Sequence, residues 1–115
     1  MANFEVARND NGDVTVLSIS GYLDAHTAPE FETAFKNLIQ ENRYKIVVSL
    51  EHLQYISSAG LGVFMGFIED VRQHDGDIKI SQASQKVFKV FDLLGFPSLY
   101  EFFDSTEDAV AKYSN

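Results

Sequence analysis

The stretch KIVVSLEHLQYISSAGLGVFMGFIEDV, residues 45–71, decides the fold. It begins with a β-branched run, Lys45–Leu50, of the kind that suits a central strand. Glu51–Ile56 leads from that strand to two serines, and from Ala59 onward the apolar residues recur with a helical period. The residues that share one helix face at this period are Leu61, Phe64, Met65, Ile68 and Val71. The stretch therefore predicts a strand that passes directly into an amphipathic helix.

Upstream of this stretch, the pattern predicts a hairpin. Phe4–Arg8 and Val14–Ser20 alternate apolar and polar residues, as half-buried strands do. Asn9–Asp13, between them, is a cluster of turn formers. Gly21–Asp24 either continues the second strand or leaves it.

A helix is expected to follow the hairpin. Thr27 is placed to cap it, and Glu30 is placed to close a capping box, with Pro29 tolerated in the first turn. Its core-facing stripe consists of Ala28, Phe31, Phe35 and Leu38.

Downstream, the pattern predicts two more strands and two more helices. Asp75–Asp77 ends the helix of the opening stretch, and Ile78–Ser81 is a short strand. Ser84 is placed to cap a third helix, Gly95 stands where a glycine ends such a helix, and Pro97 follows closely. The apolar positions of this third helix are Val87, Val90, Phe91 and Leu94, a last short strand is expected from Leu99 to Phe103, and a terminal helix runs from Ser105 to near Tyr113.

The resulting order is β-β-α-β-α-β-α-β-α. Two strand–helix–strand crossovers imply a mostly parallel sheet, and the first hairpin adds an antiparallel pair. We therefore expect one α/β domain over residues 1–115, with helices packed on a small mixed sheet.

Composition and charge exclude several classes of protein. The chain has no cysteine, which excludes disulfide scaffolds and cysteine nucleophiles, and its three histidines, His26, His52 and His74, show no metal-ligand spacing. Nine basic and seventeen acidic side chains give a formal net charge of −8, with no basic cluster for nucleic acid or an anionic membrane. No signal peptide and no run of roughly twenty apolar residues occurs. We expect a cytoplasmic protein without cofactor or metal, whose partner has a positive surface.

The adjacent serines Ser57 and Ser58 stand at the start of the second helix. The structural interpretation is that one of them caps the helix, with its oxygen accepting a hydrogen bond from the first turn. A helix start also suits a phosphate, and a phosphoserine there would place about −1.5 to −2 charges at one point of the surface.

Two glycines lie on one face of the same helix, opposite the apolar stripe. Gly62 and Gly66 are four residues apart, and glycine in an exposed helix costs about 1 kcal/mol relative to alanine. A smooth surface open to close approach by another protein would explain them. Val63 and Phe67 flank this face, and they either extend it as an apolar contact patch or cover neighbouring side chains.

The residues around the two serines do not match the common nucleotide-binding and catalytic motifs. Gly60-Leu61-Gly62 precedes a helix, but Met65 stands where the third glycine of the dinucleotide fingerprint belongs, and no Gly-Lys-Ser/Thr occurs. Ser-Ser-Ala-Gly is not the Gly-x-Ser-x-Gly elbow of the serine hydrolases. In a crossover fold, Asp24 is expected at the same sheet edge as Ser58.

Taken together, these segments resemble the STAS domain, and more narrowly the bacterial anti-sigma factor antagonists. The resemblance rests on Gly21–Asp24 before a helix, the strand Ile46–Leu50, the motif Tyr55–Gly62, and Val87–Phe96 with its leucine-glycine-aromatic turn. It covers nearly the whole chain in one register.

The resemblance implies a partner-switching regulator that is not itself an enzyme. Such proteins bind an anti-sigma factor that is also a serine kinase, of the ATP-binding GHKL type, and so free a sigma factor. The kinase phosphorylates one serine at the start of the second helix, the complex then separates, and a PP2C-type phosphatase restores the binding form. On this chain the modified serine falls on Ser58. Ser57 replaces the family's aspartate and is a competing phosphosite, and Asp24 matches an acidic residue used in kinase contact.

The residues expected to contact the partner are Asp24, Ser57, Ser58, Gly60, Gly62, Val63, Gly66 and Phe67. Two other functions stay open. A ligand-sensing STAS module would bind a nucleotide or another small anion at the start of the second helix. A hydrolase would use Ser58 with His26 or His52 and Asp24, and it has the least support because no base is placed beside the serine.

Overall fold

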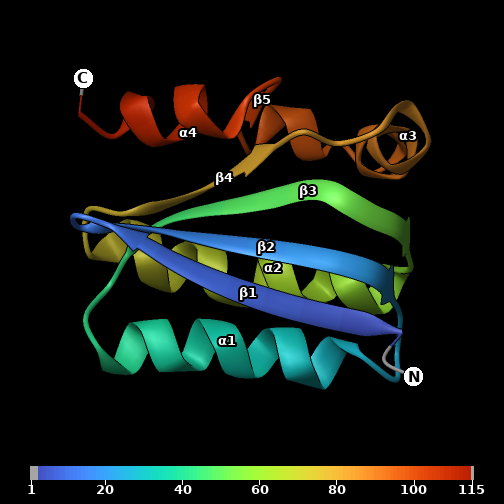
Figure 1. Cartoon of the computed structure of the whole chain (residues 1–115), viewed down its shortest axis with the longest axis horizontal. Coiled ribbons are helices and arrows are strands. Elements are labelled where there is room, and N and C mark those ends of the chain that lie inside the picture. Colours follow the sequence, from blue (N-terminus) through green and yellow to red (C-terminus); the bar gives the residue numbers. More distant parts are fainter. Residues whose placement is uncertain (1–2, 115) are drawn as a thin grey trace.

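Five strands form one mixed sheet in the order β1-β2-β3-β4-β5 (Figure 1). The computed structural model describes residues 3–114. β1 and β2 are antiparallel, while β2, β3, β4 and β5 pair in parallel, which confirms the predicted mixed sheet. The strands are β1 (Phe4–Asn11), β2 (Val14–Leu23), β3 (Lys45–Ile56), β4 (Asp77–Ser81) and β5 (Phe102–Phe103).

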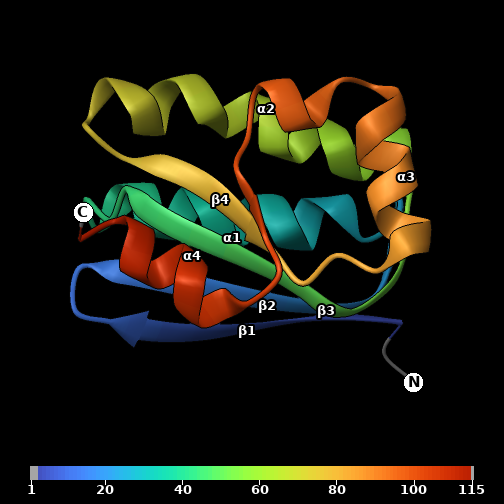
Figure 2. The same cartoon turned by 90° about the horizontal axis from the view of Figure 1, so that it is seen from above.

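The helices lie on both sides of this sheet. Figure 1 shows α1 and α2 against one face, and Figure 2 shows α4 lying across β2 and β3 on the other, with α3 at the end of the sheet. The predicted order of elements is confirmed, with one added turn of 3-10 helix, η1, after α3. The helices are α1 (Ala28–Gln40), α2 (Ser58–Gln73), α3 (Gln85–Leu93), η1 (Phe96–Ser98) and α4 (Thr106–Lys112).

Phe64 of α2 is the centre of an aromatic core between the sheet and its helices. Its ring centroid lies 5.2 Å from that of Phe31 on α1 and 5.6 Å from that of Phe91 on α3, both edge-on. The rings of Phe35, Phe96 and Tyr100 also surround it. Edge-to-face packing of this kind adds to the hydrophobic gain of burial, so this cluster holds α1, α2 and α3 in one core.

The predicted stripe of α1 is confirmed. Phe31, Phe35 and Leu38 are fully buried, and Ala28 packs against the same cluster while staying partly exposed.

The hairpin between β1 and β2 is tighter than predicted. Asn9–Asn11 belongs to β1 and pairs with Val14–Val16, so only Gly12 and Asp13 form the turn. Gly12 takes a positive φ of 63°, which a glycine adopts without strain. The turn-forming residues were misassigned because the cross-strand ladder overrides their local preference for turns.

β3 is twice as long as the predicted strand Lys45–Leu50. It continues through Glu51–Ile56, where β2 supplies its hydrogen-bonding partner as far as the pair Leu23 and Ile56. The second half has no neighbour on the β4 side, because β4 pairs only with Lys45–Ser49. His52, which lies in the stretch predicted to lead away from the strand, is therefore an exposed residue of β3 itself.

The buried face of α2 is rotated relative to the prediction. Met65 is 58% exposed, whereas Val63, expected at the flank, is only 6% exposed. The reason is the neighbouring helix: Phe67 stacks on Phe35 of α1 with ring centroids 5.2 Å apart, which draws this side of α2 toward the core.

The C-terminal part differs from the prediction mainly in the last strand. Leu99–Phe103 is strand only at Phe102–Phe103, because η1 follows the left-handed Gly95 and the ring of Tyr100 stacks on that of Phe96 at 4.9 Å. Leu94 follows the last residue of α3 and is 59% exposed, so its predicted place in the core was wrong. The predicted helix starts are confirmed: the hydroxyl of Ser84 accepts a hydrogen bond from Val87 N, and that of Ser105 from Asp108 N.

One buried cluster was not predicted from the sequence. Lys79 is 6% exposed on β4, and its ammonium contacts the carboxylates of Asp77 and Glu101. The ring of Tyr113 lies over this ammonium, and its hydroxyl is within donating distance of two carbonyl oxygens, those of Ile46 at 2.7 Å and Asp77 at 2.6 Å. These contacts hold α4 and the residue after it against the sheet.

We expect Phe64→Ala to lower the free energy of unfolding by about 3–5 kcal/mol, since it opens a cavity among five aromatic rings. Urea unfolding monitored by circular dichroism measures the change. The matched control is Met65→Ala at the exposed neighbouring position, which should change stability by less than about 0.5 kcal/mol. Similar losses for both variants would contradict this assignment of the core.

Candidate functional site

The carboxyl ends of β2 and β3 meet the start of α2. We use 'edge' here for this side of the sheet, where its parallel strands end, and not for an outermost strand. Leu23 and Ile56 are the last paired residues of the two strands, and Ser57 N donates a 2.9 Å hydrogen bond to Leu23 O. Asp24 and Ser58 each lie one residue beyond this hydrogen bond. The structure thus brings together the two loops that were expected to share an edge (Figure 1).

Gly60 makes this close approach possible. A Cβ atom at Gly60 would lie 2.6 Å from Cγ of Leu23, well inside van der Waals contact. Gly60, one of the residues expected to contact the partner, is buried and does not lie on the exposed surface of α2. Its role is to let α2 pack against the end of β2.

The two serines have different environments. Ser57 is the N-cap residue of α2, but its side chain makes no capping hydrogen bond, and its Oγ is buried without a hydrogen-bond partner in the described chain. Ser58 is the first residue of the helix and is exposed. The expected side-chain cap is therefore absent from α2, and of the two hydroxyls only that of Ser57 is enclosed by protein.

Asp24 is held by the turn that leads into α1. Its Oδ1 accepts hydrogen bonds from the backbone amides of His26 and Thr27, at 2.9 and 3.2 Å. The hydroxyl of Thr27 donates to Tyr22 O and accepts from Asp24 N, so it does not cap α1, and the expected capping box with Glu30 does not form. Asp24 consequently has a fixed position beside the start of α2.

The geometry gives no support to a catalytic site. Within residues 3–114, neither Ser57 nor Ser58 receives a hydrogen bond from a histidine ring, and the hydrogen bond between His26 and Asp24 comes from the main-chain amide of His26 and not from its ring. The same part of the chain holds no group of three metal-ligating side chains, and it contains no helix that could cross a bilayer.

A smooth strip runs along the outer side of α2. Ser58, Gly62 and Gly66 are exposed at successive intervals of four residues, and a Cβ atom at either glycine would meet nothing within 4 Å. Met65 adds an exposed apolar side chain next to this line. We call Ser58, Gly62, Met65 and Gly66 the α2 strip. Val63 is in the core, and Phe67 is half-buried against Phe35, so these two predicted contact residues mainly hold α2 to α1.

Two tyrosines beside this edge were missed by the sequence reasoning. Tyr22 and Tyr55 are 47% and 44% exposed, and their ring centroids lie 6.1 Å apart on neighbouring strands. Each stands one residue before the last buried residue of its strand, Leu23 or Ile56. Strand alternation extended to the true strand ends would have placed both on the face opposite α1 and α2.

Positive charge is absent from the segments that build this edge. Residues 14–35 and 46–71 contain six acidic side chains and neither lysine nor arginine. Seven of the cations elsewhere are engaged in ion pairs with acidic side chains, namely Arg8, Lys36, Arg43, Lys45, Arg72, Lys79 and Lys112. These two segments therefore present a neutral to acidic surface, which attracts a partner of positive charge.

Comparison with known proteins identifies the family. The STAS domain model matches residues 5–109. The anti-sigma-B factor antagonist of Staphylococcus epidermidis is 30% identical over 105 residues, which cover 91% of this chain and 95% of the relative. The chain belongs to the STAS-domain family and, within it, to the anti-sigma factor antagonists.

Solved structures confirm the fold. An anti-sigma factor antagonist from Mycobacterium paratuberculosis superposes with a TM-score of 0.89 at 20% identity, covering 97% of this chain and 95% of that one. The antagonist SpoIIAA matches in its unphosphorylated form with a TM-score of 0.83 (20% identity, 94% of this chain and 95% of that one). The phosphorylated form of the Bacillus SpoIIAA matches with 0.73 (20% identity, 95% and 97%).

Because the Ser57 hydroxyl makes no hydrogen bond, replacing this N-cap serine is expected not to lower the stability of the protein. We expect Ser57→Ala to keep the free energy of unfolding within about 0.5 kcal/mol of the unmodified protein or to raise it, because the variant removes a buried hydroxyl that makes no hydrogen bond. Ser84→Ala, which removes the side-chain cap of α3, should cost about 1 kcal/mol. Equal losses in urea unfolding would mean that Ser57 caps α2 after all.

The two glycines at the start of α2 are expected to respond in opposite directions to alanine. Gly60→Ala should lower stability by about 1–3 kcal/mol, since its methyl group collides with Leu23. Gly62→Ala should raise stability by about 0.5–1 kcal/mol, since it improves helix propensity in open space. The midpoints of thermal unfolding distinguish the two outcomes, and a gain from Gly60→Ala would refute the packing role.

Proposed function

We propose that phosphorylation of Ser58 switches this anti-sigma factor antagonist between a form that binds its anti-sigma factor and a form that does not. The observation that carries the proposal is the contrast between the two serines. Ser58 is exposed at the head of the α2 strip, in line with Gly62 and Gly66, whereas Oγ of Ser57 is enclosed. A kinase can reach the first hydroxyl without unfolding the helix start, so we assign the switch to Ser58 and not to Ser57.

The charge distribution explains how a phosphate at Ser58 would act. A phosphoserine adds about −1.5 to −2 charges, and the segments around it contain no lysine or arginine to neutralise them. The backbone amides at the start of α2 stabilise part of this charge. The rest of the negative charge would stay on the binding surface. A docking partner would have to displace the water around the phosphate, which costs free energy. The switch thus needs no change of fold in this chain.

The same distribution defines the partner. The α2 strip has no Cβ atoms at Gly62 and Gly66, which lets another backbone approach closely. Its acidic surroundings, Asp24 included, fit a positively charged surface. We propose that this partner is an anti-sigma factor that is also a serine kinase of the ATP-binding GHKL type, and that a PP2C-type phosphatase reverses the modification. In this scheme the chain is a substrate and a ligand and performs no chemistry of its own.

SpoIIAA supports the scheme because it has been solved both phosphorylated and unphosphorylated, and both forms resemble this chain in fold. A nucleotide or another anion at the start of α2 is the weaker alternative. Its phosphates would meet the same acidic segments, without a lysine or arginine from them to bind it.

The first test is phosphorylation by candidate anti-sigma factor kinases from the same genome, with the modified residue mapped by mass spectrometry. We expect the kinase to phosphorylate the protein without substitutions and the Ser57→Ala variant. We expect no phosphorylation of Ser58→Ala. Phosphate found on Ser57 would overturn the assignment.

The second test measures partner binding by calorimetry. Ser58→Asp should weaken binding by at least about tenfold through desolvation and repulsion, while Ser58→Ala should bind like the unmodified protein. Equal affinity of all three forms would argue against a switch at this position.

The α2 strip makes a separate prediction. Gly66→Ala should raise the thermal midpoint because it improves helix propensity, yet weaken partner binding by about fivefold or more, because its methyl group projects into the contact. Gln73→Ala, at the exposed far end of the same helix, is the matched control and should leave binding unchanged. Unaltered affinity of Gly66→Ala would exclude the strip from the interface.

A further inference from the structure

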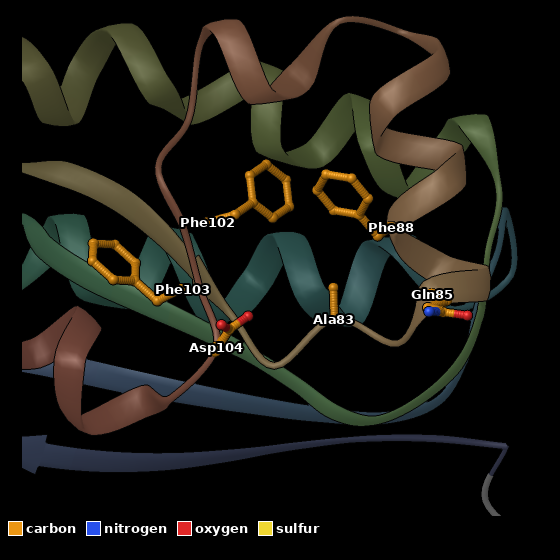
Figure 3. Close-up of a pocket in the computed structure, with 6 residues that line it drawn as sticks. All are labelled: Ala83, Gln85, Phe88, Phe102, Phe103 and Asp104. Carbon is orange, nitrogen blue, oxygen red and sulfur yellow. The ribbon is translucent and has the colours of Figure 1, made fainter.

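A small cleft opens where β4 and β5 end, away from the α2 strip. Its volume is about 240 Å³, and it lies between α3, the connection from β4 to α3, and the segment that leaves β5 (Figure 3). Ala83, Gln85, Phe88, Phe102, Phe103 and Asp104 line it. In open α/β sheets, the carboxyl ends of parallel strands are where ligands bind, and β4 and β5 are parallel.

The walls of this cleft are fixed by hydrogen bonds. Gln82 N donates to Phe103 O at 2.9 Å, which joins the two segments at the base. The hydroxyl of Thr106 donates to Oε1 of Gln82 at 2.7 Å, and the capping hydroxyl of Ser84 fixes the start of α3. The cleft is therefore preformed, so a ligand would lose little free energy in ordering it.

Its apolar lining is aromatic. The rings of Phe88 and Phe102 meet edge to face with centroids 5.2 Å apart, and Figure 3 shows the two rings next to each other. Phe102 also packs on the buried Phe91, at 5.4 Å. Phe88, Phe102 and Phe103 are nevertheless only half-buried, so apolar surface stays in contact with water that a ligand would cover.

The polar groups at the rim carry negative charge and no positive charge. Asp104 is exposed, and within residues 3–114 its carboxylate forms neither an ion pair nor a hydrogen bond. The side-chain amide of Gln85 is likewise without a hydrogen bond in this part of the chain. Because Asp104 lines the same cleft as the rings, a bound cation would be attracted by the negative charge of the carboxylate and by the face of any ring that it contacts.

We propose that this cleft is a binding site for a small organic amine, in which an ammonium group pairs with Asp104 and an apolar or aromatic body lies against Phe88 and Phe102. The volume sets the size. It exceeds the cavity of about 150 Å³ that holds benzene in an engineered protein, and it is smaller than pockets for drug-sized ligands, which begin near about 300 Å³. A molecule the size of an aromatic amino-acid side chain fits between these limits. The carboxylate disfavours anions such as nucleotides.

The test is a titration of the ¹⁵N-labelled protein with phenethylammonium, followed by amide chemical shifts. We expect shifts confined to the amides around residues 83–88 and 102–104, with a Kd of about 1 mM, as befits a ligand of this size. Phenethyl alcohol, which has the same body without the charge, should bind at least fivefold more weakly. Shifts spread over the whole surface, or equal binding of the alcohol, would overturn the proposal.

Two variants assign the binding to the named side chains. Asp104→Asn should weaken phenethylammonium at least fivefold, whereas Asp92→Asn, an exposed position on α3 outside the cleft, should bind like the unmodified protein. Phe88→Leu keeps an apolar wall but removes one ring face, and it should also weaken binding. Unchanged affinity of Asp104→Asn, in a protein whose other amide shifts show that it is folded, would refute the site.

Discussion

A single hydrogen bond between the ends of two strands, from Ser57 N to Leu23 O, sets the arrangement on which the site depends. It closes the sheet at the point where β2 and β3 stop, and Gly60 lets α2 pack directly on Leu23 just beyond it. The first turn of α2 is thereby fixed next to the turn that holds Asp24. Because Ser57 is drawn into this junction, its hydroxyl is enclosed and Ser58 becomes the first exposed position of the helix.

Charge is distributed unevenly between the two edges of the sheet. Lys45 and Lys79, at or near the amino ends of β3 and β4, pair with Asp13 and Asp77. The segments that form the opposite edge carry acidic residues and no lysine or arginine. Exposed ion pairs add little stability, but their position leaves the two segments that carry Asp24 and Ser58 without a lysine or arginine. A phosphate on Ser58 would therefore change the charge of the binding surface, because these segments contain no lysine or arginine that could neutralise it by forming an ion pair.

The sequence predicted the order of elements, the mixed sheet and the stripe of α1, because each rests on a local period of apolar residues. It failed where a neighbouring element decides. The buried face of α2 includes Val63 and not Met65, since α1 packs along that side. The second half of β3 was read as a connection because its residues lack a β-branched run, and β2 supplies their partners. The cap expected of Thr27 did not form, since its hydroxyl bonds to the end of β2 instead, and the side-chain cap expected of one of the two serines is absent from α2.

For the candidate site, the sequence by itself determined which residues stand at the helix start: two serines, the glycines at intervals of four, and an acidic residue before α1. These follow from spacing along one chain, and so does the absence of lysine and arginine around them. Only the tertiary structure decided which serine is exposed, that Gly60 is a packing residue, and that Tyr22 and Tyr55 meet. The reason is that burial and contact depend on which strand ends lie side by side, and no local pattern in the sequence specifies that.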